Sequence, residues 1–149
     1  MALFDVISED IKKAMIAKDK VALVALRGVK KEFLEAKTAK GASGELADDA
    51  ALKILQKMVK QRKESAQIFT EQNRPELAQN ELAEAAVIEK YLPAKLSDAE
   101  LEAEIKAIIA EVGAKTAQEM GKVMGVATKK LAGKADGKEI SAKVKALLS

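Results

Sequence analysis

The sequence contains no cysteine and no histidine among its 149 residues. Disulfide bonds, thiolate nucleophiles and zinc sites built from these residues are therefore excluded. Catalytic triads that need an imidazole base are excluded for the same reason. Acid–base catalysis would require a carboxylate or a lysine with a strongly perturbed pKa, since no remaining side chain titrates near neutrality. We accordingly predict no cofactor and no metal site.

Aromatic residues and prolines are also scarce. Aromatic side chains make up 3% of the chain, tryptophan is absent and only two prolines occur. Hydrophobic residues nevertheless reach 48%, and charged residues reach 33%. Alanine, lysine and glutamate favour helices because they lose little conformational freedom on entering one. A core of small aliphatic side chains suits closely packed helices, so the composition predicts an all-α fold.

The first ten residues, Met-Ala-Leu-Phe-Asp-Val-Ile-Ser-Glu-Asp, do not resemble a signal peptide. They carry acidic side chains and lack a basic region followed by an apolar run. Elsewhere no apolar run approaches the length that crosses a bilayer. We therefore expect a cytoplasmic protein without a membrane partner.

Apolar residues spaced three and four apart predict four helices in the first part of the chain. The first covers approximately residues 4–15, and the second follows the capping residue Asp19. Two glycines in residues 38–46 predict a loop. The third helix should begin near Asp48, and the fourth should run from Pro75 to about Leu92, because Pro93 disfavours helix in the residue before it.

Three further helices are predicted after a short linker. Each is preceded by a capping residue with a glutamate three positions later, a pattern typical of helix starts. These pairs are Ser97 with Glu100, Thr116 with Glu119, and Asp136 with Glu139. The fold class is therefore an all-α arrangement with two domains. A bundle of about four helices spans residues 1–94, and a small three-helix domain spans residues 95–149.

Positive charge is concentrated near the C-terminus. Residues 113–149 hold eight lysines and three acidic residues, a net charge of +5, whereas residues 96–112 have a net charge of −4. Spaced cations suit the phosphate backbone of a nucleic acid. The candidate RNA-binding residues are Lys122, Lys129, Lys130, Lys134 and Lys138, together with a ridge on the third helix formed by Lys53, Lys57, Lys60 and Lys63. For the ridge, the alternative is an ordinary solvated helix face.

Four glycines in the same region are candidates for close packing or turns. Gly121 and Gly125 are four residues apart on one helix, and we expect them to let a neighbouring helix approach. Gly133 and Gly137 flank the turn before the last helix, whose N-terminus and nearby lysines suit an anion. That turn could equally be a structural connection between helices. No phosphate-binding loop of the G-x-x-x-x-G-K-[S/T] type is present.

A polar cluster interrupts the apolar pattern of the first domain. Arg62 occupies an otherwise apolar stripe on the third helix, and Glu81 and Glu84 do the same on the fourth. Because a short turn joins these helices, an arginine–glutamate ion pair that fixes their register is one interpretation. The other is a polar pocket that binds a ligand or moves a proton, to which Arg27 would also contribute.

Several phrases in this sequence, taken in order, resemble the YqeY family. They are Leu26-Arg27, Lys60-Gln61-Arg62-Lys63-Glu64-Ser65, Arg74-Pro75-Glu76-Leu77-Ala78, Tyr91-Leu92-Pro93, Met120-Gly121-Lys122-Val123-Met124, and Gly133-Lys134-Ala135-Asp136-Gly137. The resemblance implies an N-terminal helical bundle and a small helical domain. That small domain is similar to the tail of GatB, the B subunit of the glutamine-dependent aminoacyl-tRNA amidotransferase.

In GatB the tail helps to hold the tRNA while another domain transfers the amide. The resemblance therefore implies RNA contacts at residues 121–124 and 133–137 of this chain. Lys134 stands where the family usually has an arginine, which keeps the charge but loses the bidentate geometry of a guanidinium. The catalytic body of the amidotransferase has no counterpart here. Carbon–nitrogen ligase activity with glutamine as the amido-nitrogen donor would describe the relative rather than this chain.

Three functions follow as hypotheses. The first is a non-catalytic accessory module of translation that binds tRNA or another structured RNA. The alternative is a protein-interaction module that docks on an amidotransferase or another translation factor. The third is a small enzyme that uses the polar cluster, and we favour a non-catalytic role over it because no catalytic site is visible.

Overall fold

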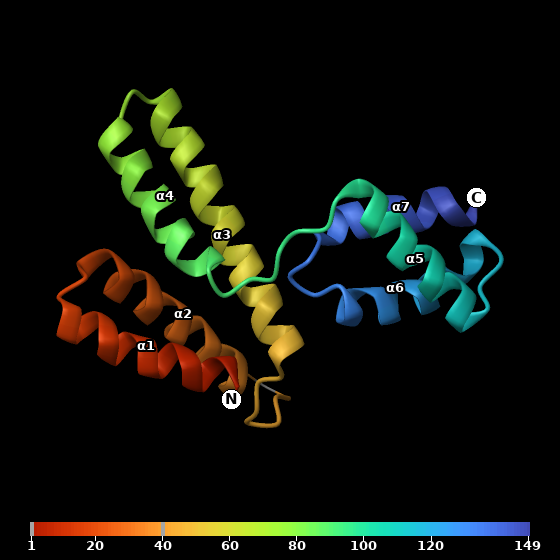
Figure 1. Ribbon diagram of the computed structural model, residues 1–149, viewed down its shortest axis with the longest axis horizontal. Coiled ribbons are helices and arrows are strands. Elements are labelled where there is room, and N and C mark those ends of the chain that lie inside the picture. The colour runs from red at the N-terminus through yellow and green to blue at the C-terminus, as the bar shows by residue number, and fades with distance from the viewer. Residues whose placement is uncertain (1, 40) are drawn as a thin grey trace. The chain divides into compact units, whose positions relative to one another are not determined.

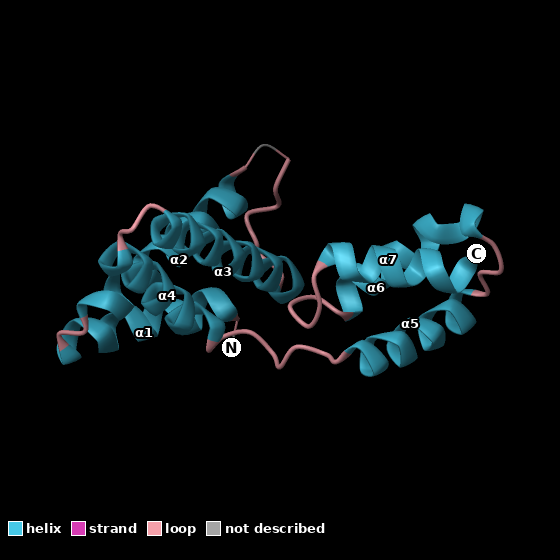
Figure 2. Cartoon of the chain, turned by 90° about the horizontal axis from the view of Figure 1, so that it is seen from above, coloured by secondary structure: helices cyan, strands magenta, loops and turns pink. Residues whose placement is uncertain are grey.

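The computed structural model describes residues 2–39 and 41–149. Within these residues it contains seven α-helices, one short 3-10 helix and no strand, which confirms the all-α class (Figure 2). The chain divides into two compact units, one that ends at Leu92 and one that spans Pro93–Ser149. In the described ranges, no helix has the length and low charge that crossing a membrane requires.

The first unit consists of two helical hairpins. Helix α1 pairs with α2, and α3 pairs with α4 (Figure 1). The Asp19 side chain caps α2, as predicted, by accepting a hydrogen bond from the Ala22 N–H at 3.1 Å. Helix α4 ends three residues before the predicted Leu92. The bounds are α1 Leu3–Ala17, α2 Lys20–Thr38, α3 Asp48–Glu71 and α4 Pro75–Glu89.

The core of the first unit lies where α2 packs against α1, α3 and α4. Its most deeply buried side chains are Ile7, Val29, Phe33, Leu55 and Ile88, each with no exposed surface. At the edge of this core the Tyr91 hydroxyl donates a hydrogen bond to an Asp10 carboxylate oxygen at 2.5 Å. The pKa of Tyr91 is raised well above its ordinary value. Partial burial is the larger cause, and the hydrogen bond to the Asp10 carboxylate is the next. This bond ties α1 to the end of α4.

The second unit consists of three α-helices and a 3-10 turn: α5 Asp98–Val112, η1 Ala117–Glu119, α6 Met120–Lys130 and α7 Gly137–Leu148. The predicted capping box is present at α5, where Ser97 and Glu100 exchange side-chain hydrogen bonds with each other's backbone N–H. Helix α5 ends at Gly113, which adopts a left-handed conformation with φ of 71°. Glycine is favoured in this conformation because glycine lacks a Cβ.

The predicted capping box of Thr116 and Glu119 is present, but it opens a 3-10 turn rather than the α-helix itself. Residues 117–119 after Thr116 form the 3-10 turn, and the α-helix begins only at Met120. The Glu119 carboxylate accepts hydrogen bonds from the backbone N–H groups of Lys115 and Thr116. These two bonds hold the pKa of Glu119 below its usual range. The three helices enclose a second aliphatic core, whose most buried members include Ile105, Ile108, Val123, Leu131 and Val144.

Candidate nucleic-acid interface

The turn between α6 and α7 is held in place by its own buried residues and by backbone hydrogen bonds. Leu131 and Ala135 are buried in the core of the second unit. Gly133 has a φ of 77°, which confirms its role as a turn glycine. The Lys134 carbonyl accepts a hydrogen bond from the Leu96 N–H at 2.9 Å, and so fastens the turn to the segment before α5. The backbone that carries Lys134 is therefore firmly positioned.

Helix α7 begins directly after this turn. The Asp136 side chain caps the helix by accepting a hydrogen bond from the Lys138 N–H at 3.1 Å. Gly137 is the first residue of α7 and does not have a positive φ. Contrary to our expectation, it is therefore not a second turn glycine. Asp136 also occupies the helix N-terminus that we considered for an anion. Any anion at this end of α7 would therefore meet the lysine side chains rather than the N-terminal N–H groups.

Four of the five predicted RNA-binding lysines in this unit are exposed and take part in no ion pair among the described residues. They are Lys122, Lys129, Lys134 and Lys138, and we call them the basic face. Lys122 and Lys129 are seven residues apart on α6, so they project from the same side of that helix. The fifth lysine, Lys130, is also exposed, but its Nζ lies 2.6 Å from the Glu111 carboxylate of α5. Part of its charge is thus already neutralised.

The prediction that Gly121 and Gly125 admit a neighbouring helix is wrong. Both glycines are exposed on α6, and a Cβ placed on either one would meet no atom within 4 Å. The spacing of small residues did place both on one side of the helix, but that side faces solvent. Val123 and Ala127 form the buried side instead.

The lysine ridge on α3 is exposed along its length, as the side chains of Lys53, Lys57, Lys60 and Lys63 all reach solvent. Lys63 forms an ion pair with Glu89 of α4. Both side chains are about half exposed, so the pair contributes little to stability. The lysine ridge is therefore a solvated helix face, and at least one of its lysines already forms an ion pair.

The predicted polar cluster is only partly assembled. An Arg62 guanidinium nitrogen lies 3.8 Å from a Glu84 carboxylate oxygen, and each side chain is about one-fifth exposed. Gly28 of α2 lies beside this arginine, and a Cβ there would be in ordinary van der Waals contact with the same guanidinium nitrogen, at 3.4 Å. No ion pair among the described residues reaches Glu81, which is half-buried. Arg27 is exposed on α2 and does not join the cluster, contrary to our expectation.

Replacing Arg62 with methionine should lower the free energy of unfolding by about 2 kcal/mol. Breaking a fully buried ion pair costs about 3–5 kcal/mol, and the loss here is smaller because Glu84 retains some contact with water. The matched control is Lys63→Met, which removes the half-exposed pair with Glu89 and should cost less than about 1 kcal/mol. Urea denaturation of both variants measures the difference. Equal losses would show that the Arg62 pair has no special role.

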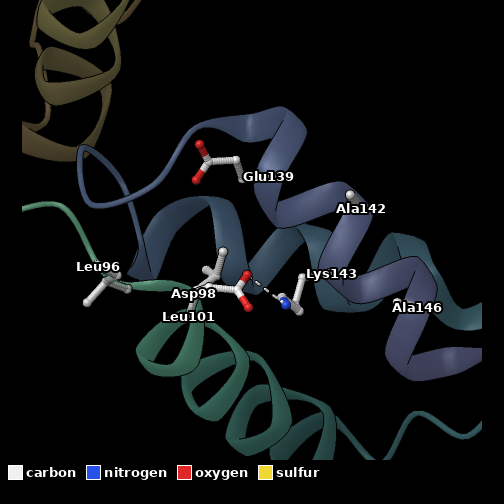
Figure 3. A pocket seen from close by; sticks show the side chains of 7 residues that line it. All are labelled: Leu96, Asp98, Leu101, Glu139, Ala142, Lys143 and Ala146. Atoms are coloured by element: carbon white, nitrogen blue, oxygen red, sulfur yellow. Dashed lines mark ion pairs between the residues drawn. The ribbon is translucent and has the colours of Figure 1, made fainter.

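A groove that sequence analysis missed lies between α5 and α7. Its volume is about 450 Å³, and its lining combines four aliphatic side chains with three charged ones: Leu96, Asp98, Leu101, Glu139, Ala142, Lys143 and Ala146 (Figure 3). The Lys143 ammonium lies 2.9 Å from the Asp98 carboxylate. This hydrogen bond raises the pKa of Lys143. The i, i+4 spacing of Ala142 and Ala146 on α7 is the one local sequence signal of this groove. The other side of the groove is formed by α5, which no pattern within α7 indicates.

Comparison with known proteins identifies the family. Residues 4–148 match the profile of the family described as Yqey-like protein. The chain belongs to the YqeY-like family. The match covers both units, so the order of helices described above is that of a YqeY-like chain.

Curated relatives include three fungal proteins, each named "Altered inheritance of mitochondria protein 41, mitochondrial". The protein of Clavispora lusitaniae is 34% identical over 78% of this chain and 68% of its own length. That of Lachancea thermotolerans is 33% identical over 71% of this chain and 57% of its own length. That of Meyerozyma guilliermondii is 39% identical over 61% of this chain. This chain therefore spans between 47% and 68% of the relatives it matches.

Proposed function

We propose that this YqeY-like chain is a non-catalytic module that binds structured RNA, with tRNA as the first candidate, through the basic face of its second unit. The observation that carries the proposal is the basic face itself. Four exposed lysines without ion-pair partners among the described residues stand on α6, the following turn and α7. The segment that carries them, residues 113–149, has a net charge of +5, and such a segment favours a polyanionic partner.

Recognition by this surface would depend on phosphates and on RNA shape. All four aromatic residues of the chain, Phe4, Phe33, Phe69 and Tyr91, precede the second unit. Base stacking on aromatic side chains is therefore not available to the basic face. Lysine is a compact point charge without a fixed fork, which suits contacts to phosphate oxygens rather than to base edges. Such contacts position an RNA by its shape.

The exposed glycines of α6 support the same proposal. Gly125 lies between Lys122 and Lys129 in the sequence, on the same side of the helix. Because no side chain covers the helix backbone there, a sugar–phosphate chain could approach it more closely than on an ordinary helix. The two lysines would then flank the approaching phosphates.

The groove between α5 and α7 favours a second candidate, a protein-interaction module. Its lining combines aliphatic with charged side chains, which is a feature of a docking surface for a peptide or helix. One of the lining residues, Glu139, also forms a 3.1 Å ion pair with Lys95. A translation factor such as an amidotransferase is the partner we propose for it. The cytoplasmic location expected from the N-terminal sequence remains a prediction, since the names of the fungal relatives place those proteins in mitochondria.

Titration of total tRNA against the intact chain at about 50 mM and about 200 mM salt tests the first candidate. For four phosphate contacts, affinity should fall by about a hundredfold between these salt concentrations. A complex that is insensitive to salt would contradict phosphate recognition. If no complex forms even at the lower salt concentration, the docking function is favoured, and binding to a purified amidotransferase becomes the next measurement.

A further inference from the structure

The α1–α2 hairpin ends in an exposed aliphatic surface that the RNA-binding proposal does not use. Met15 and Ile16 come from the last turn of α1, and Val21 and Val24 come from the first two turns of α2. We call these four residues the hairpin tip; the turn that joins α1 and α2 is seen in Figure 1. Ile16 is 84% exposed and Val24 is 59% exposed. Single exposed aliphatic residues are common, but these four all belong to residues 15–24, at the end of the hairpin where α1 passes into α2, and gathered exposed apolar residues are typical of interaction sites.

Lysines surround the hairpin tip. Lys12, Lys13, Lys18 and Lys20 are all exposed, and residues 12–24 carry a net charge of +3. The one acidic residue in this segment, Asp19, turns its carboxylate toward the Ala22 N–H to cap α2. The nearest acidic side chain on α1, Asp10, lies 3.9 Å from Lys13 and also accepts the Tyr91 hydrogen bond. The tip therefore presents aliphatic and cationic groups together.

We propose that the hairpin tip binds the surface of an anionic lipid bilayer. Met15, Ile16 and the two valines would enter the boundary between headgroups and acyl chains, while the lysines remain among the anionic headgroups. Aliphatic burial and cation attraction are each weak alone, and stable attachment to a membrane combines two such signals. The shape of the tip favours a lipid surface over a partner helix. Consecutive residues Lys12 and Lys13 project about 100° apart, so one partner helix would meet only some of the cations.

The sequence-based expectation of no membrane partner rested on the lengths of apolar runs. A long apolar run indicates a membrane-spanning segment. It gives no information about separate apolar residues, such as those of the hairpin tip, that come from two consecutive helices. Peripheral attachment through the tip is compatible with the absence of any spanning helix in the described residues.

Flotation of the intact chain with vesicles tests the proposal. The chain should bind vesicles that contain about 30% phosphatidylserine and should not bind vesicles of phosphatidylcholine alone. The double variant Met15→Ser/Ile16→Ser should reduce the partition coefficient at least about tenfold, because two aliphatic side chains no longer enter the bilayer. The matched control is Ile68→Ser/Leu82→Ser. These residues are 52% and 48% exposed and belong to the other hairpin of this unit, on α3 and α4, so their replacement should leave binding unchanged.

Fluorescence provides a direct measure of insertion, because the chain has no tryptophan. In the variant Ile16→Trp, the added indole should shift its emission to shorter wavelength when anionic vesicles are added. In Ile68→Trp the emission should not move. Both positions are exposed, so circular dichroism should show unchanged helix content and separate loss of binding from loss of fold.

The second unit supplies the control for simple electrostatic attraction. A variant with Lys122, Lys129, Lys134 and Lys138 changed to glutamine should keep the blue shift of Ile16→Trp. The proposal is overturned if vesicles are not bound, if tip and control variants lose binding equally, or if Ile16→Trp shows no shift. It is likewise overturned if binding survives the serine substitutions at the tip but disappears with the four lysines.

Discussion

Changing Lys122, Lys129, Lys134 and Lys138 together to glutamine should remove most of the affinity of this chain for tRNA. Each lysine that contacts a phosphate releases a condensed counterion, so the slope of log affinity against log salt should fall by about three to four. At about 50 mM salt the expected loss of affinity is at least about a hundredfold. Because all four side chains are exposed, the free energy of unfolding should change little.

The α3 ridge offers a matched comparison. Glutamine at Lys53, Lys57, Lys60 and Lys63 changes the net charge by the same amount but acts on the first unit. If binding depends on the basic face, this variant should retain nearly all of the affinity and salt dependence. A larger loss of affinity in the α3 variant would indicate that the interface lies on α3. Equal losses of affinity would show that only the net charge matters. Gel-shift titrations of both variants with one tRNA preparation distinguish these outcomes.

Local sequence signals predicted the helices well because capping and helix termination depend on neighbouring residues. Asp19 and Ser97 cap the helices expected of them, and Gly113 ends α5 with the left-handed backbone that glycine favours. The end of α4 was predicted less well. Pro93 sets only the last position that the helix could reach, and the chain leaves the helix at Lys90.

Contacts between helices were harder to predict, since periodicity places residues on a side of a helix without naming its neighbour. The Arg62–Glu84 pair was expected because one short turn joins α3 and α4. Gly121 and Gly125 were assigned to a packed side that proved to face solvent. The Lys130–Glu111 pair joins residues 19 positions apart, and no pattern within α6 indicates it. The hairpin tip was missed for a similar reason, because periodicity within one helix does not show that Ile16 of α1 and Val24 of α2 belong to the same end of a hairpin.

Replacing Phe33 with alanine should destabilise the first unit selectively. Phe33 has no exposed surface and lies in the core of that unit. Its removal leaves a large cavity, so the free energy of unfolding should fall by about 3–5 kcal/mol. The matched control is Leu34→Ala on the same helix. Leu34 is 43% exposed, and its loss should cost less than about 1 kcal/mol because little buried surface is removed.

Two probes allow the units to be followed separately. Tyr91 is the only tyrosine and belongs to the first unit, so its fluorescence reports that unit, whereas circular dichroism reports helices in both. The two aliphatic cores share no residue. Phe33→Ala should therefore lower the urea midpoint detected by Tyr91 and leave a later dichroism transition from the second unit. Ile105→Ala, in the second core, should have the opposite effect. A single transition that shifts in both variants would show instead that the two units unfold together.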